Sequence, residues 1–117
     1  MGIISAIGDT VAQNRQSLKK GISGIGHAKH FVSKYTQLLP FAEIDYSTSD
    51  LKKKLNITQS GATRTDLLAL YAFREAIADA QLETSSLVSR QIALLGASTV
   101  GGMCLTDELY ADANKKG

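Results

Sequence analysis

The sequence is poor in the residues that cross-link or interrupt a chain. It has one cysteine, one proline and no tryptophan among 117 residues. Cys104 cannot form an internal disulfide, and its neighbours are methionine and leucine rather than the histidine or cation that would activate a thiolate. Pro40 is the only residue that is intrinsically incompatible with a helix interior. The composition therefore favours a helical domain without a catalytic cysteine.

Long apolar runs are also missing. The longest uncharged stretch, residues 91–106, is interrupted by three glycines and is shorter than the roughly 20 apolar residues that a membrane-spanning helix needs. The first residues, MGIISAIG, lack the basic region of a signal peptide. We expect a protein that is either cytoplasmic or exported without cleavage, and the sequence does not choose between the two.

Aliphatic side chains recur every seven residues through the first third of the chain. They are Ile4, Val11, Leu18, Ile25, Val32 and Leu39. A repeat of seven residues is close to two helical turns, so the pattern predicts a long N-terminal helical section. Gly21 and Gly24 lie within this section and indicate either close approach of another helix or a break. The spacing GxxGxG, with no strand before it, does not fit a phosphate-binding loop.

A second helical section is predicted from Thr63, which can cap a helix that has Asp66 at its third position. Residues 64–95 are predicted to form one amphipathic helix about 48 Å long, with a break at residues 84–86 as the alternative. A short helix through DLKKKL precedes it, and Thr106 is expected to cap a short C-terminal helix with Asp107 and Glu108 in its first turn. The predicted fold is therefore all-α, with residues 1–117 forming a single domain, either an elongated helical hairpin or a small bundle.

Residue types with catalytic potential are present but do not form a recognisable constellation. His27 and His30 are three residues apart, yet no acidic residue lies between Thr10 and Ala42 to complete a metal site. The carboxylates of Glu75, Asp79 and Glu83 are spaced by four residues and are expected on an exposed helix edge. We therefore expect no catalytic, cofactor-binding or metal-binding site, no small-molecule substrate, and a protein that is not an enzyme.

Charge is divided unevenly between the two halves of the chain. Residues 1–60 contain eight basic and four acidic residues, a net charge of +4, whereas residues 61–117 contain five basic and seven acidic residues, a net charge of −2. Such a division suits either a surface that faces a polyanion or head-to-tail contact between copies.

These patterns favour a structural subunit that assembles with copies of itself into a filament, pilus, needle or shell. The residues predicted to pack at the self-assembly interface are Ile4, Val11, Leu18, Gly21, Gly24, Ile25, Leu87 and Leu94. The charged residues predicted to set the register between copies, or to contact a polyanion, are Arg15, Lys19, Lys20, Lys29, Lys34, Glu75 and Asp79. A contact between two different surfaces of one chain would propagate into a ring or a filament.

Three alternatives remain open at the level of sequence. The basic segment 15–34 is compatible with a small nucleic-acid-binding or nucleoprotein-coat protein, because a row of cations can follow a phosphate backbone. A compact helical adaptor or secretion chaperone is the second. In the third, an amphipathic N-terminal helix lies on an anionic membrane surface through Ile3, Ile4, Ile7 and Val11.

Overall fold

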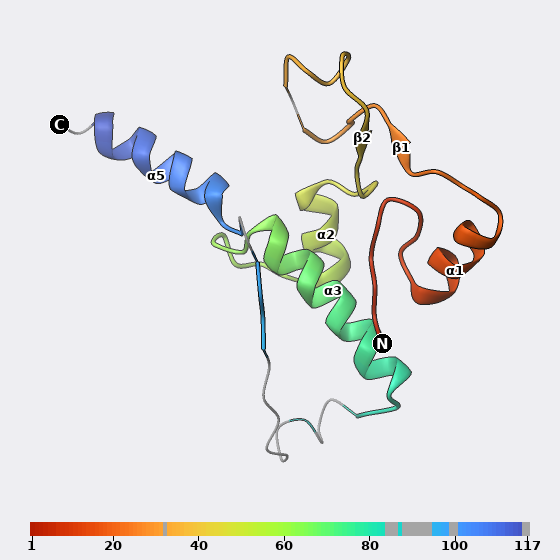
Figure 1. Ribbon diagram of the computed structural model, residues 1–117. Coiled ribbons are helices and arrows are strands. Elements are labelled where there is room, and N and C mark those ends of the chain that lie inside the picture. The colour runs from red at the N-terminus through yellow and green to blue at the C-terminus, as the bar shows by residue number, and fades with distance from the viewer. Residues whose placement is uncertain (32, 84–86, 88–94, 99–100, 116–117) are drawn as a thin grey trace.

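The computed structural model describes residues 1–31, 33–83, 87, 95–98 and 101–115. Within these residues the chain forms four helices and one two-stranded antiparallel sheet (Figure 1). The elements are α1 (Val11–Lys19), β1 (Ile25–Gly26), β2 (Phe41–Ala42), α2 (Thr48–Leu55), α3 (Arg64–Asp79) and α5 (Met103–Lys115). The prediction of an all-α fold is therefore wrong, because the fold is mostly helical but includes a sheet.

The long N-terminal helical section is replaced by several short elements. Residues 1–10 form a non-helical segment with a tight Ser5–Gly8 bridge, and α1 begins only after Thr10, whose side chain accepts a hydrogen bond from the Gln13 N–H. α1 ends where Gly21 takes a φ of +63° and the Ile22 N–H donates to the Ser17 carbonyl at 2.9 Å. Glycine adopts this left-handed conformation with the least strain, so Gly21 ends the helix instead of lying inside it.

A residue in the left-handed conformation also follows α2 and α3. After α2, Asn56 has a φ of 55° and the Ile57 N–H donates to the Lys52 carbonyl. After α3, Gln81 has a φ of 53° and the Leu82 N–H donates to the Ile77 carbonyl. α3 therefore ends at Asp79, and the prediction of one helix over residues 64–95 is wrong. Leu94 and the alternative break at residues 84–86 lie outside the described residues.

The starts of α2 and α3 follow from local capping. Ser47 and Thr63 each accept a hydrogen bond from the third backbone N–H of the helix, and the carboxylates of Asp50 and Asp66 return to the cap backbone. The predicted cap at Thr63 is confirmed. α5 begins at Met103 instead of after Thr106, so the prediction that acidic residues occupy its first turn is wrong.

The core is small and lies between α2 and α3. Among the described residues, the buried hydrophobic side chains are Leu51, Leu55 and Leu67. The radius of gyration is 17.1 Å, whereas a compact domain of this length would have a value of about 13 Å. Figure 1 shows the reason for the difference: α5 extends away from α2 and α3, on the side of the molecule opposite to α1.

Candidate functional site

The N-terminal segment is held against α3 by a carboxylate. Glu75 Oε2 accepts a hydrogen bond from the Ile3 N–H at 2.8 Å, and Glu75 Oε1 accepts one from the Val11 N–H at 2.7 Å. Asp79 pairs with the amino group of Met1. Glu75 and Asp79, which we expected to face a neighbouring copy, thus make their described contacts within the chain. Because Val11 is the first residue of α1, Glu75 also places a negative charge at the positive end of that helix.

α1 buries polar side chains instead of apolar ones. Asn14 and Ser17 are only 6% and 9% exposed. The Asn14 side-chain amide donates to the carbonyls of Gly8 and Thr10, at 2.8 Å each, and the Ser17 hydroxyl donates to the Ile7 carbonyl at 2.7 Å. Because a buried polar group is costly only when it is unpaired, these hydrogen bonds let α1 pack through its polar face.

The apolar side chains of α1 consequently line an open groove of about 410 Å³ on the surface. Val11 and Leu18 are one heptad apart on α1, and Leu18 is 70% exposed. The residues that line this groove are Met1, Ile3, Val11, Asn14, Arg15, Leu18 and Lys19. We call it the α1 groove. It brings together four residues singled out from the sequence, namely Val11 and Leu18 with the cations Arg15 and Lys19.

Met1 was not singled out from the sequence, and Ile3 was grouped with Val11 only in the membrane alternative, on a helix that does not form. Met1 and Ile3 reach α1 because the chain reverses between residues 5 and 8 and because Glu75, more than 60 residues away in sequence, fixes the segment. No local sequence pattern indicates a contact of that range.

The other predicted interface residues lie elsewhere. Ile4 packs against the α2–α3 core, and Ile25 lies in β1 with 66% of its surface exposed. A Cβ on Gly24 would be 2.7 Å from that of Ala6, so this glycine allows a close approach within the chain, whereas Gly21 faces open space. Leu87 lines a second apolar groove of about 510 Å³. This α3 groove is formed by Leu70, Phe73, Arg74, Ile77, Ala78, Leu82 and Leu87.

The basic segment does not form one continuous row of cations. Arg15 and Lys19 lie on α1, and Lys20 follows directly. Lys29 lies beyond β1 and its Nζ is 3.0 and 3.1 Å from the two carboxylate oxygens of Asp45. Lys34 lies over the ring of its neighbour Tyr35, 5.0 Å from the centroid. The fold therefore distributes the five predicted cations over two separate regions.

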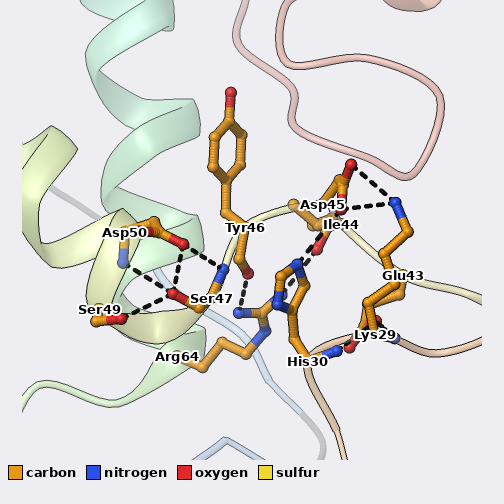
Figure 2. Close-up of polar contacts among 10 residues, drawn as sticks. All are labelled: Lys29, His30, Glu43, Ile44, Asp45, Tyr46, Ser47, Ser49, Asp50 and Arg64. Carbon is orange, nitrogen blue, oxygen red and sulfur yellow. Dashed lines mark hydrogen bonds and ion pairs between the residues drawn. The ribbon is translucent and has the colours of Figure 1, made fainter.

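Figure 2 shows the polar cluster around Asp45, which joins the loop after β1 to the chain after β2. Glu43 Oε2 accepts hydrogen bonds from the backbone N–H groups of Lys29 and His30, at 2.6 and 3.1 Å. Desolvation opposes ionisation of Glu43, but these two donors and nearby positive charge together outweigh it and hold the pKa of Glu43 below the usual value. Hydrogen bonding and charge from Lys29 likewise lower the pKa of Asp45.

Arg64 extends the cluster from the start of α3. Its guanidinium donates to the carbonyls of Ile44 and Tyr46, at 3.1 and 2.7 Å (Figure 2). A hollow of about 260 Å³ beside the cluster is lined by residues that include His27, Glu43 and Asp45. Since each described charge of the cluster is paired with backbone or with an opposite charge, its evident role is to fix the loops around the sheet.

Tyr46 connects the N-terminal segment to α2. Its hydroxyl donates to Asp9 at 2.5 Å and accepts from Lys54 Nζ at 2.6 Å. Lys54 Nζ also lies 4.2 Å from the Tyr46 ring centroid and 5.4 Å from that of Tyr71. The hydrogen bond to Asp9 is the main cause that raises the pKa of Tyr46, and the bond to Tyr46 is the main cause that raises the pKa of Lys54.

The two histidines singled out from the sequence do not join a cluster of metal-ligating side chains within the described part of the chain. His27 Nδ1 lies 3.3 Å from the Thr36 carbonyl, and His30 Nε2 lies 3.4 Å from Asp45 Oδ1. The two histidines lie in a loop and not on a helix, and no three metal-ligating side chains converge among the described residues. The side chain of Cys104 lies outside the description. None of the described helices has the length and apolar content needed to cross a bilayer.

Comparison with known proteins adds no assignment. No family model, no curated protein and no solved structure matches the chain. The described features that bear on function are therefore the α1 groove, the exposed side chains of α5 and the small core.

Proposed function

We propose that this protein is a non-enzymatic structural subunit that assembles with copies of itself through exposed apolar surfaces. The observation that carries the proposal is the inverted orientation of α1. Its polar residues Asn14 and Ser17 are buried and fully hydrogen-bonded, whereas Leu18 is 70% exposed. Full burial of a leucine side chain is worth roughly 1.5–3 kcal/mol. An isolated copy forgoes most of that stabilisation, and a copy with a covered groove gains it.

The distribution of apolar side chains over the described chain supports the same proposal. Exposed large hydrophobic residues outnumber the three buried ones there. They are Met1, Ile3, Leu18, Ile22, Ile25, Phe31, Tyr35, Leu38, Leu39, Leu95, Met103, Leu109 and Tyr110. Single exposed leucines are ordinary, but apolar residues gathered in a groove are typical of a binding surface.

The alternatives receive less support from the geometry. A nucleic-acid-binding role would rest on a continuous row of cations, and Lys29 is paired with Asp45 on a different part of the chain from Arg15 and Lys19. A compact adaptor would have a smaller radius than the observed 17.1 Å. A helix lying on a membrane would require helical residues before Val11, and these residues are not helical.

The proposal is tested by measuring mass against concentration. Multi-angle light scattering from about 10 µM to about 1 mM detects self-association with dissociation constants up to about 1 mM, and negative-stain microscopy of the same samples shows the particles. We expect a mass that rises with concentration and particles of regular shape. A constant mass of 12.5 kDa over the whole range would overturn the proposal. Binding to single-stranded DNA that is lost with salt, without self-association, would favour the nucleic-acid alternative.

A further inference from the structure

We propose that α5 of one copy docks into the α1 groove of the next copy. The inference rests on the proposed function, because it names the two surfaces through which copies meet. Three observations carry it: the exposed apolar residues of α5, the charges of the two surfaces, and their positions on the molecule.

α5 presents apolar side chains that its own chain leaves uncovered. Met103 is 62% exposed, and Leu109 and Tyr110 are 71% exposed each. Met103 and Tyr110 are seven residues apart and therefore lie on the same face of the helix. Leu109 lies about 100° around the helix from Tyr110, so the exposed apolar surface extends from that face onto its flank. Such a helix is the usual occupant of an apolar groove, which it enters with residues spaced by one or two turns.

The charges of the two surfaces are opposite. Residues 103–117 contain Asp107, Glu108 and Asp112 against Lys115 and Lys116, a net charge of −1. α1 contains Arg15 and Lys19 and no acidic residue, a net charge of +2. Both cations line the α1 groove. An acidic helix is therefore steered toward this groove, and the same charges fix its orientation.

The arrangement in space indicates that the occupant comes from another copy. In Figure 1, α5 and α1 lie on opposite sides of the molecule, with α2 and α3 between them. A helix that leaves one side and a groove on the other form a contact between unlike surfaces. Such a contact repeats from copy to copy and yields an open filament or, if the rotation closes, a ring.

Three substitutions of the same type test this contact. Leu18→Asp places a charge in the groove, Leu109→Asp places one on α5, and Leu38→Asp places one in a loop that belongs to neither surface. The three leucines are 70%, 71% and 74% exposed, so each substitution removes a comparable exposed side chain and leaves the core intact. Circular dichroism of the dilute proteins checks that all three variants are folded.

We expect the Leu38→Asp variant to assemble like the wild type, and each of the other two variants to remain at 12.5 kDa when alone. The Leu18→Asp variant keeps an intact α5, and the Leu109→Asp variant keeps an intact groove. An equimolar mixture of these two should therefore form a 1:1 complex of twice the monomer mass and nothing larger. We also expect the association rate of the wild type to fall about tenfold between about 50 and about 500 mM NaCl.

The outcomes distinguish this inference from the proposed function. If the wild type assembles and the Leu109→Asp variant assembles equally well, the docking of α5 is overturned and self-assembly stands. If both single variants fail but their mixture gives no 1:1 complex, the pairing of these two surfaces is overturned. If α5 instead folds back onto the α3 groove of its own chain, Leu109→Asp leaves the assembled mass unchanged and lowers the melting temperature of the monomer. A monomeric wild type overturns both proposals.

Discussion

Removal of the Glu75 carboxylate is expected to release the N-terminal segment from α3 without unfolding the core. Glu75→Ala removes the acceptors for the N–H groups of Ile3 and Val11, and Glu75→Gln leaves one acceptor and removes the charge. A hydrogen bond to an ionised group contributes roughly 1.5–3 kcal/mol. Because Glu75 is only half-buried, solvent weakens both hydrogen bonds, and we expect the alanine variant to lose about 2 kcal/mol in total from the two.

The assay is amide hydrogen exchange by NMR below the concentration of assembly. A loss of about 2 kcal/mol corresponds to about a 30-fold fall in protection of the Ile3 and Val11 amides. The Leu67 amide, which donates to the Thr63 carbonyl in the core helix α3, should keep its protection. Gln16→Ala, at an exposed position of α1, is the matched control and should leave the protection of all three amides unchanged.

Two results would refute this reasoning. Unchanged protection at Ile3 and Val11 in the alanine variant would mean that the Glu75 hydrogen bonds do not hold the segment. An equal loss at Leu67 would mean that Glu75 supports the whole fold and not the segment alone. In the Glu75→Gln variant, the protection of the Ile3 and Val11 amides should lie between that of the wild type and that of the alanine variant.

Three further predictions concern stability. Leu51→Ala should lower the free energy of unfolding by about 2–5 kcal/mol in urea, since Leu51 is 0% exposed, and a loss below about 1 kcal/mol would contradict the assigned core. Gly21→Ala should cost about 1–2 kcal/mol in thermal unfolding, because its φ of +63° strains any residue with a Cβ, and an unchanged melting temperature would argue against the turn. The pKa values of Tyr46 and Lys54 are raised in the folded state, so both groups stabilise the fold below their usual values of 10.0 and 10.5, and this stabilisation is lost as pH rises through the raised pKa values. The urea midpoint should therefore decrease as the pH is raised above about 10, and the decrease should be smaller in the Tyr46→Phe variant. A wild-type midpoint independent of pH would refute the contribution of Tyr46 and Lys54 to stability.

The elements that could be predicted are those whose signals are local. Thr63 with Asp66 forms the expected capping box. The short helix expected through DLKKKL is α2, which begins two residues earlier, at Thr48. The seven-residue ladder misled the prediction because its aliphatic residues lie on different elements, with Ile4 before α1 and Ile25 in β1. The glycine turn after α1 outweighed the periodicity. Strands of two residues, held by contacts from distant loops, leave no alternating pattern to detect.

The candidate site was predictable to the extent that it lies on one helix. Val11, Arg15 and Leu18 share the groove because they are four and seven residues apart on α1, which the sequence spacing indicates. The burial of Asn14 and Ser17 was not predictable, because their partners are backbone carbonyls of the preceding segment. The left-handed turn at Gln81 was equally hidden, since glutamine has no preference for that conformation.

The hydrogen bonds of Glu75 also impose an order of events on any assembly through the α1 groove. Synthesis proceeds from the N-terminus, so Ile3 and α1 are made long before the carboxylate that holds them together. A partly translated chain thus has no finished receptor to offer, even though its leucines are already present. Copies would become competent to join only on completion of α3, which would keep unfinished chains out of a growing polymer.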